Sequence, residues 1–418
     1  MSTPPGFARY ADRLWAEALP LDELAERFGT PCYVYSRAAI EERWALYRSA
    51  LGVAGDVCYA VKANGNLALL QLLARHGAGF DIVSGGELER VLHAGGDAAR
   101  VVFSGVGKGT DEIRRALQAG IRCFNVESAA ELERIASVAA TENTPAPVAL
   151  RVNPDVNPET HPYIATGLAQ SKFGIALEEA EALYLQAAND PRLEVRGIAC
   201  HIGSQLLSVA PLTEAAERLA ALARRLQEQG ISLDHIDAGG GLGVHYIDEQ
   251  PPTPAEHIEA ISAPLRDLGV SVLVEPGRAI VAEAGILLTR IEYLKHNGGK
   301  EFAIVDAGMN DYLRPALYDA AHTLEAVTPS EAELRPVDVV GPVCESADTF
   351  ARDCTLPAAA GGLLAIRSAG AYGAVMASQY NARPRPPEVL VDGTQAHLIR
   401  RRETIDELMS GESLLPEG

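Results

Sequence analysis

The chain has 418 residues, too many for one ordinary domain, so we expect two. Hydrophobic residues make up 47% and charged residues 22%, as is usual for a globular protein with a large core. The formal net charge of -20 argues against nucleic acid or an anionic membrane as a partner. No apolar run reaches the length of a membrane span, and the first ten residues do not read as a secretion signal.

The six cysteines are scattered along the chain, without a Cys-x-x-Cys pair, at positions 32, 58, 123, 200, 344 and 354. In a chain of this length, that spacing predicts neither a disulfide framework nor a zinc site, and we expect no metal. Cys58, Cys123 and Cys200 lie in apolar runs and are predicted to be small core residues. The expected compartment is the reducing cytoplasm.

From residue 57 to residue 278, short apolar runs alternate with amphipathic stretches. The eight predicted strands are 57–62, 79–84, 101–105, 122–127, 148–152, 197–202, 234–238 and 270–275. Helical patterns between them include 67–75, 86–94, 128–141, 177–188 and 212–229. Eight such units over about 220 residues predict a (β/α)8 barrel, whose usual size is about 250 residues.

A ninth apolar run, Cys32–Ser36, precedes the first barrel unit and is predicted to join a second domain. After about residue 280, strand-like segments follow one another without helices between them, at 285–293, 301–306, 335–341, 363–366 and 388–391. This pattern is typical of a β-rich domain. We therefore expect an α/β protein with a TIM-type barrel over residues 37–280 and a mainly β domain formed by residues 1–36 with 281–418.

Lys62 lies where the apolar segment of Tyr59-Ala-Val-Lys-Ala-Asn64 runs into a turn. A lysine at the mouth of a buried strand can act as a nucleophile, because desolvation favours the free amine that forms a Schiff base. It can also simply extend its stem along apolar surface and keep its ammonium in water. The residues at the other strand ends help to decide, since the chemistry of such barrels sits where strands end and βα loops begin.

Polar or glycine-rich segments follow several of these strands. The second strand carries Asp81 and runs into Ser84-Gly-Gly-Glu87. The sixth, seventh and eighth strands end at His201-Ile-Gly-Ser-Gln205, Gly239-Gly-Gly-Leu-Gly243 and Glu275-Pro-Gly-Arg278. Glycines after strand seven let backbone N–H groups approach a phosphate closely, although a flexible turn would use them as well.

Glu275 and His201 each allow two interpretations. Glu275 either pairs with Arg278 or holds a pyridine nitrogen protonated, and His201 either packs in the core or stacks on a cofactor ring. An amine, a phosphate-binding loop, a carboxylate and an aromatic ring on one barrel face together match the requirements of pyridoxal phosphate (PLP). The sequence therefore predicts PLP as the cofactor.

Nine short motifs, which span almost the whole chain, resemble those of the alanine-racemase-type PLP-dependent decarboxylases. They are YAVKAN (59–64), FDIVSGGEL (80–88), HIGSQ (201–205), GGGLG (239–243), EPGR (275–278), DAGMN (306–310), RPALY (314–318), GPVCES (341–346) and SAGAYG (368–373). The resemblance implies that Lys62 carries the cofactor as a Schiff base, that His201 stacks on its ring and that Glu275 binds the pyridine nitrogen. The full set of predicted cofactor-binding residues is Lys62, Asp81, His201, Ser204, Gly239, Gly240, Gly241, Glu275, Gly277, Arg278 and Tyr372.

The resemblance also implies a homodimer with shared active sites. The family's Cys-Glu pair, here Cys344 and Glu345, crosses the dimer interface into the neighbouring subunit's site. Cys344 is the predicted acid that protonates the substrate carbon, with Lys62 as the other candidate donor; a small packing cysteine is the alternative. A carboxylate at the pyridine nitrogen, such as Glu275, favours decarboxylation, whereas racemases of the same fold place an arginine there.

The predicted substrate-binding residues are Arg278, Arg314, Tyr318, Glu345 and Tyr372. An ornithine-type substrate has only a distal ammonium, whereas meso-diaminopimelate carries an ammonium and a carboxylate there, which a glutamate and an arginine can pair. We therefore expect decarboxylation of meso-diaminopimelate at its D-centre to give L-lysine and CO₂, the last step of lysine biosynthesis. The alternatives are a related decarboxylase for ornithine, arginine, carboxynorspermidine or a carrier-bound amino acid, and a non-catalytic PLP-binding protein.

Overall fold

The computed structural model describes residues 6–53, 55–157 and 171–416. The chain divides into two compact units. One comprises residues 43–244 and 249–279, and is called the barrel unit below. The other comprises residues 1–42, 245–248 and 280–418, and is called the sheet unit.

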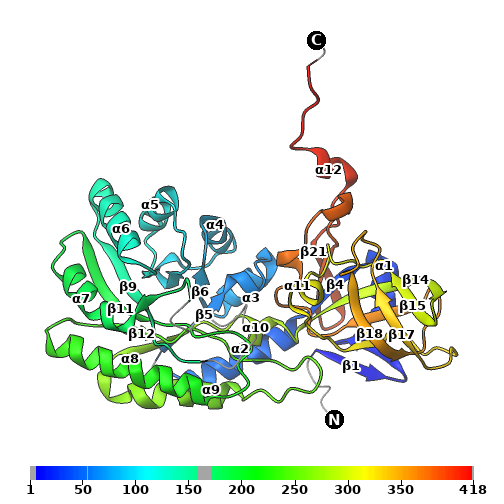
Figure 1. Ribbon diagram of the computed structural model, residues 1–418, viewed down its shortest axis with the longest axis horizontal. Coiled ribbons are helices and arrows are strands. Elements are labelled where there is room, and N and C mark those ends of the chain that lie inside the picture. Colours follow the sequence, from blue (N-terminus) through cyan, green and yellow to red (C-terminus); the bar gives the residue numbers. More distant parts are fainter. Residues whose placement is uncertain (1–5, 54, 158–170, 417–418) are drawn as a thin grey trace. The chain divides into compact units, whose positions relative to one another are not determined.

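The barrel unit contains a closed barrel of eight parallel strands (Figure 1). Neighbouring strands pair in parallel, β8 also pairs with β9, and β13 pairs with β5, which closes the sheet. The predicted (β/α)8 barrel is therefore confirmed. The strands are β5 (Gly55–Ala60), β6 (Gly79–Ile82), β7 (Val101–Phe103), β8 (Cys123–Val126), β9 (Ala146–Asn153), β11 (Leu193–Ala199), β12 (His235–Asp237) and β13 (Ser271–Val274), with the short β10 (Ile175–Ala176) beside β9.

Helices follow the barrel strands, and several of them begin at a residue whose side chain caps the helix. Ser84 Oγ accepts the backbone N–H of Glu87, and Ser128 Oγ accepts that of Glu131, as expected at helix N-caps. The Ser84-Gly-Gly-Glu87 motif is thus the start of a helix. The helices are α2 (Arg37–Leu51), α3 (Leu67–Arg75), α4 (Gly85–His93), α5 (Thr110–Ala119), α6 (Ala129–Glu142), α7 (Leu177–Ala188), α8 (Ala210–Glu228), α9 (Pro254–Ser262) and α10 (Arg278–Val281), with 3₁₀ helices η1 (Val61–Ala63), η2 (Ala98–Arg100) and η4 (Ala263–Leu268).

Small apolar side chains fill the barrel interior. They form one buried cluster, made of Cys58, Val102, Cys123, Ala149, Ala199 and Leu273. These residues come from strands all around the barrel, so their side chains meet inside it. The prediction that Cys58, Cys123 and Cys200 are core residues is confirmed, because all three are buried and free.

The predicted strands overlap the observed ones, but most of them run past the carboxyl end of the observed strand. The first was predicted to run to Lys62, whereas β5 ends at Ala60 and Lys62 lies in the 3₁₀ turn η1. Ala60 N–H donates to Pro276 O, in the segment that follows β13. The apolar residues continue past the point where the sheet pairing stops, so sequence alone overestimates the strand.

The sheet unit is mainly β, as expected. One sheet has the order β18-β17-β15-β14-β4-β20-β21, with β19 pairing to β14 and β16. β4 pairs with β14 and β20, so the prediction that Cys32–Ser36 joins this domain is confirmed. The elements are β1 (Phe7–Tyr10), β2 (Arg13–Ala16), β3 (Leu19–Pro20), α1 (Leu21–Phe28), β4 (Cys32–Ser36), β14 (Gly285–Asn297), β15 (Lys300–Val305), α11 (Arg314–Tyr318), β16 (Leu324–Ala326), β17 (Arg335–Val340), β18 (Thr349–Leu356), β19 (Leu363–Ile366), η5 (Ala374–Met376), η6 (Tyr380–Ala382), β20 (Glu388–Asp392), β21 (Gln395–Arg400) and α12 (Ile405–Met409).

Within the described ranges, no helix combines the length and the apolar character that crossing a bilayer requires.

His257 on α9 gives the barrel unit a predicted dependence on pH. It is fully buried, its ring meets Tyr47 edge-on at 5.9 Å between centroids, and burial lowers its pKa from 6.5 to about 4. Between these two values the unfolded chain binds a proton that the folded chain does not, so the folded state loses stability as the pH falls. We expect His257→Met to flatten this decline, which can reach about 1.4 kcal/mol per pH unit for one such group.

The measurement is the free energy of unfolding as a function of pH for the barrel transition. His93→Met is the matched control, because His93 is exposed on α4 and its replacement leaves the slope unchanged. A wild-type slope that persists in His257→Met would contradict the prediction.

Candidate active site

The cofactor-binding residues predicted from the barrel sequence all lie at the carboxyl ends of its strands. The parallel arrangement places these ends at one rim, so residues far apart in sequence meet there. Lys62 follows β5, Asp81 lies on β6, His201 and Ser204 follow β11, Gly239–Gly241 follow β12, and Glu275, Gly277 and Arg278 follow β13.

Lys62 and Asp81 form an ion pair at this rim. The Lys62 ammonium nitrogen donates to Asp81 Oδ2 at 2.7 Å, and the pairing register places Ala60 beside Asp81. Asp81 is fully buried, whereas the Lys62 side chain is 32% exposed. Asp81 Oδ1 is buried and has no hydrogen-bond partner among the described residues. The lysine therefore reaches the rim held at its tip by a carboxylate inside the barrel.

Glu275 is a buried carboxyl surrounded by polar groups of other strands. Its Oε1 accepts hydrogen bonds from Ser104 Oγ at 3.4 Å and from Asn125 Nδ2 at 3.5 Å. Burial, together with the negative charges of Asp237 and Asp81, raises the pKa of Glu275 well above its usual value. A carboxyl of this kind can exchange a proton with a basic ring nitrogen.

His201 is uncharged at neutral pH. Burial and the positive charges of Arg151 and Lys62 lower its pKa well below the usual value. Its Nδ1 accepts the backbone N–H of Gly240 at 3.3 Å, which fixes the plane of the ring. A neutral ring held in this way is suited to stack on a flat aromatic cofactor.

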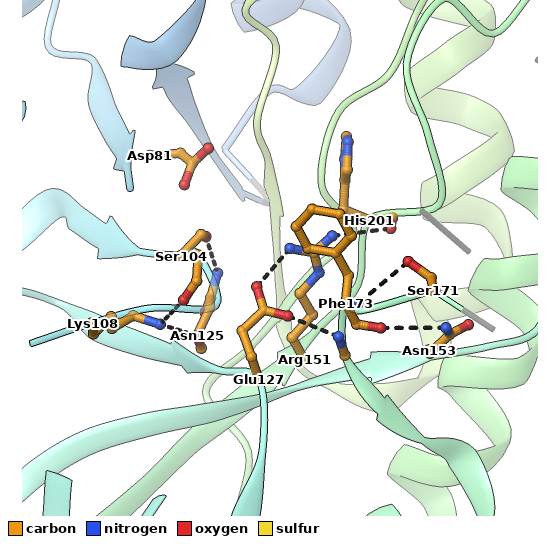
Figure 2. Close-up of polar contacts among 12 residues, drawn as sticks. Asp81, Ser104, Lys108, Asn125, Glu127, Arg151, Asn153, Ser171, Phe173 and His201 are labelled. Atoms are coloured by element: carbon orange, nitrogen blue, oxygen red, sulfur yellow. Dashed lines mark hydrogen bonds and ion pairs between the residues drawn. The ribbon is translucent and has the colours of Figure 1, made fainter. Parts of the chain in front are cut away.

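A buried ion pair supports the His201 backbone. Arg151 Nη1 donates to Glu127 Oε1 at 2.7 Å, and its Nη2 donates to His201 O at 3.4 Å (Figure 2). The guanidinium carbon lies 4.9 Å from the ring centroid of Phe173, and Glu127 Oε2 accepts the Gly174 N–H at 2.8 Å. The ion pair therefore joins strands β8 and β9 to the segment that carries Phe173.

The three glycines after β12 are required by close backbone packing. A Cβ on Gly239 would lie 2.4 Å from Cys200 O, and one on Gly240 would lie 2.2 Å from Glu275 O. A Cβ on Gly241 would lie 2.4 Å from Gly203 O, at a residue whose φ is +110°. The sequence allowed two interpretations of these glycines, a flexible turn and a phosphate-binding loop. The structure adds a separate reason for them, because any side chain here would displace the neighbouring strand ends.

Ser204 and Arg278 lie together beside this loop. Arg278 Nη2 and Nε donate to Ser204 Oγ at 3.0 and 3.3 Å, and Arg278 is buried. Gly277 packs against the barrel, because a Cβ there would lie 2.9 Å from that of Ala63. A buried guanidinium beside a hydroxyl and glycine backbone has the donors that a phosphate or carboxylate needs.

Sequence reasoning missed five polar residues of the rim. Asp237, Asn125 and Ser104 surround Glu275, and Glu127 and Arg151 support His201. Asp237 carried a usable signal, because it is an ionisable residue inside an apolar strand that must be buried on both faces. The three glycines that follow closely after it are the stronger pattern in the sequence.

In the sheet unit, Arg314 is held against aromatic side chains. It begins α11, is buried, and its Nη1 donates to the hydroxyl of Tyr246, while its guanidinium carbon lies 4.6 Å from that ring's centroid. Burial alone lowers the pKa of Arg314, but the phenol oxygens of Tyr246, Tyr312 and Tyr372 outweigh it and raise the pKa overall. Tyr246 is a further residue that the sequence did not indicate.

Tyr318 and Tyr372, the predicted substrate-binding tyrosines, are both partly buried in the sheet unit. Tyr318 ends α11, which begins at Arg314. Tyr372 has a φ of +54°, a left-handed conformation that is uncommon for an aromatic residue and is retained where the surroundings enforce it.

Cys344 and Glu345 are exposed on a loop with a defined shape. Asp348 fixes the loop, since its two oxygens accept the backbone N–H groups of Met309 at 2.6 Å and Val343 at 2.7 Å. The segment after η5 supplies two further bonds, in which the Cys344 N–H donates to Asn381 Oδ1 at 2.9 Å and the Tyr380 hydroxyl donates to Glu345 Oε1 at 2.5 Å. Both predicted functional side chains are therefore presented on a preformed loop.

The barrel rim fits pyridoxal phosphate. Lys62 supplies an amine, Asp81 Oδ1 is a buried acceptor without a partner among the described residues, and Glu275 is a carboxyl that can exchange a proton with the pyridine nitrogen. His201 offers a neutral ring, and the glycine loop with Arg278 offers phosphate donors. The chemistry of this set matches the aldehyde, ring and phosphate of the cofactor.

A closed parallel barrel with this rim defines a class of PLP-dependent enzyme, and comparison with known families agrees. The family described as "Pyridoxal-dependent decarboxylase, pyridoxal binding domain" matches residues 37–282. The chain therefore belongs to the pyridoxal-dependent decarboxylases.

Within this family, the chain is similar to diaminopimelate decarboxylases. It is 60% identical over 405 residues to that of Pseudomonas aeruginosa, covering 97% of this chain and 98% of the relative. The crystal structure of the Helicobacter pylori enzyme complexed with L-lysine has a TM-score of 0.91 and 44% identity, covering 93% of this chain and 98% of that one. The M. jannaschii enzyme in complex with L-lysine has a TM-score of 0.94 and 38% identity, covering 98% of both chains.

The Asp348→Asn substitution tests how the Cys344 loop is held. An asparagine can still accept one backbone N–H, but its amide group would face the second N–H, donor against donor, at a cost of about 1–3 kcal/mol. We expect a lower unfolding midpoint of the sheet unit and faster alkylation of Cys344. The alkylation rate is measured by mass spectrometry of the labelled peptide.

Asp353→Asn is the control, because Asp353 is exposed and asparagine tolerates its positive φ of +48°. Equal alkylation rates in Asp348→Asn and the wild type would show that the carboxylate does not shape the loop.

Proposed function

We propose that this chain decarboxylates meso-diaminopimelate at its D-centre, giving L-lysine and CO₂ as the last step of lysine biosynthesis. The observation that carries the proposal is the presence at one barrel rim of both an amine, Lys62, which is bonded to Asp81, and a buried protonatable carboxyl, Glu275. The high identity to diaminopimelate decarboxylases and the L-lysine complexes of two relatives support the substrate and the product.

Residues of the barrel rim would hold the cofactor. Lys62 is its covalent anchor, His201 covers one face of the ring, and Glu275 binds the pyridine nitrogen. Asp81 of the rim and Tyr372, a residue of the sheet unit, complete the proposed contacts. The proposed phosphate-binding residues are Ser204, Gly239, Gly240, Gly241, Gly277 and Arg278. When bound, pyridoxal phosphate draws in the electron pair left on the α-carbon as CO₂ departs.

Cys344 is the proposed proton donor. The α-carbon of the D-centre needs a proton in place of the departing CO₂, and the Cys344 Sγ–H would deliver it. Its exposure and the fixed backbone around it suit a group that must meet a substrate. The L-centre takes no part in the reaction and is retained in the product.

The far end of the substrate is recognised by charge. Arg314 pairs with the distal carboxylate and Glu345 with the distal ammonium, while Arg278, Tyr318 and Tyr372 complete the substrate site. Burial of Arg314 against Tyr246 supports this role, because a buried guanidinium that keeps its charge gains from a carboxylate partner. Ornithine has no distal carboxylate, so Arg314 would be left without that partner.

We propose a homodimer in which Cys344 and Glu345 serve the partner's barrel rim. Residues 37–280 then form the cofactor-binding domain, and residues 1–36 with 281–418 contribute to the active site and the dimer interface. The cytoplasm suits such an enzyme, because Cys344 is an exposed thiol that must stay reduced to donate its proton.

The direct test is an assay of CO₂ release and L-lysine formation. We expect turnover of meso-diaminopimelate and, with ornithine or arginine, activity lower by at least about a hundredfold, because a buried charge without its partner costs roughly 3 kcal/mol or more. Lys62→Ala should abolish both activity and the absorbance of the bound cofactor. Turnover of ornithine alone would contradict the proposed substrate, and cofactor absorbance that persists in Lys62→Ala would contradict the proposed anchor.

A second experiment tests the shared site. Lys62→Ala and Cys344→Ala should each be inactive, but chains of the two variants co-expressed in equal amounts should recover about a quarter of wild-type activity. The reason is that half of the dimers are mixed and each mixed dimer has one intact site. The control is co-expression of either single variant with the double variant Lys62→Ala/Cys344→Ala, which should recover no activity. No recovery in the first mixture would show that each site is built from one chain.

A further inference from the structure

Two acidic side chains are buried next to each other beneath the barrel rim. Asp237 lies on β12 and is 1% exposed, and Glu275 follows β13 and is 7% exposed. Asn125 Nδ2 donates to both side chains, to Asp237 Oδ2 at 3.0 Å and to Glu275 Oε1 at 3.5 Å, so a single amide nitrogen holds the two carboxyl groups close together. Because burial next to another carboxyl disfavours a charge on both, we expect the pair to keep one proton.

The neighbours of the pair decide which oxygen carries the proton. Asp237 Oδ1 accepts the Gly239 N–H at 3.0 Å, and its Oδ2 accepts Asn125 Nδ2 at 3.0 Å. Glu275 Oε1 meets Ser104 and Asn125 at the longer distances of 3.4 and 3.5 Å. Asp237 accepts the shorter hydrogen bonds and is better stabilised as the carboxylate, so Glu275 is the partner that carries the proton.

Charged groups on the surrounding strands favour retention of this proton. Asp81 on β6 adds negative charge, and Lys62 opposes it but is bonded to Asp81. The thiols of Cys58, Cys123 and Cys200 remain neutral, because burial raises their pKa. Burial itself disfavours a second negative charge on the pair, as in other carboxyl pairs that share one proton.

We propose that Asp237 is a positioning residue that stores a proton with Glu275, and that this proton passes to the pyridine nitrogen when the cofactor binds. The O–H bond of Glu275 breaks, the lone pair of the ring nitrogen forms the new N–H bond, and Glu275 remains as the carboxylate that accepts it. The ring thus becomes positively charged without taking a proton from water. The inference rests on the proposed contact between Glu275 and the pyridine nitrogen.

The Asp237 carboxylate then contributes after binding as well as before it. Once Glu275 is ionised, the pair carries two negative charges next to one positively charged ring. An opposite charge favours the protonated state of the ring, so the nitrogen keeps its proton to higher pH. Asp237 would act in this way without touching the cofactor.

Asp237→Asn tests the proposal with little change in shape. The new amide can donate to Glu275, and Asn125 Oδ1, which has no partner among the described residues, can accept from it after rotation of the Asn125 amide. Burial still raises the pKa of Glu275, but without the negative charge of Asp237 this pKa falls, and we expect Glu275 to enter binding ionised. The proton for the ring nitrogen must come from solvent.

The measurement is the number of protons taken up when cofactor-free full-length chain binds pyridoxal phosphate. It is obtained by calorimetry at about pH 8 in buffers of different ionisation enthalpy. We expect Asp237→Asn to take up about one proton more than the wild type, because changes at Lys62 and at the phosphate are common to both and cancel. Asp234→Asn is the control, since Asp234 is exposed just before the same strand and should match the wild type.

Equal proton uptake in the wild type and Asp237→Asn would overturn the proposal. A wild-type chain that fails to develop cofactor absorbance would instead overturn the proposed function, so the two failures are distinguishable. If Asp237→Asn does not fold or bind, infrared difference spectra of the wild type decide. Loss of a protonated carboxyl band on cofactor binding is expected, and an unchanged band refutes the stored proton.

Discussion

The closure of the parallel barrel is the constraint on which the rest of the candidate site depends. Because β13 pairs with β5 and β8 with β9, all eight strands end at a single rim, and side chains from distant parts of the sequence become neighbours there. The glycines after β12 are part of the same constraint. Gly240 has room for no side chain against Glu275 O, so the loop and the end of β13 can approach only through backbone. The position of Glu275 thus follows from packing as well as from its own hydrogen bonds.

Closure also buries charge, and the barrel handles it in two ways. Lys108 with Glu131 and Arg151 with Glu127 are buried ion pairs whose remaining donors bond to backbone carbonyls, an arrangement that keeps a desolvated pair from becoming costly. Asp237 and Glu275 are held differently, by a hydrogen-bond donor that they share, Asn125. An ion pair is neutral and has its charges fixed, whereas a carboxyl pair can gain or lose a proton. The second arrangement lies where we propose that the cofactor ring binds.

The sequence predicted the barrel well, because parallel strands buried on both faces leave short apolar runs that helical patterns separate. It also predicted most of the polar residues at the rim, because functional residues of such barrels lie at the carboxyl ends of the strands. It missed residues whose role depends on contacts across the fold. Asp237 is a single polar residue in an apolar strand, and only the closed sheet brings it next to Glu275, where Asn125 donates to both carboxyl groups. Tyr246 supports Arg314, 68 residues further along the chain, through a contact that no local pattern encodes.

The proposed cofactor contacts and the proposed substrate contacts come mostly from different parts of the chain. The barrel unit supplies the amine, the carboxyl pair and the neutral histidine, which we propose act on the cofactor whatever amino acid is bound. The sheet unit supplies Arg314, Cys344 and Glu345, and holds them with its own tyrosines and with Asp348. On this proposal, most of the residues that would select a substrate lie in the sheet unit, with Arg278 of the barrel unit as the exception. The proton that Asp237 and Glu275 hold is, by the same reasoning, a property of the barrel that decarboxylases with other substrates can share.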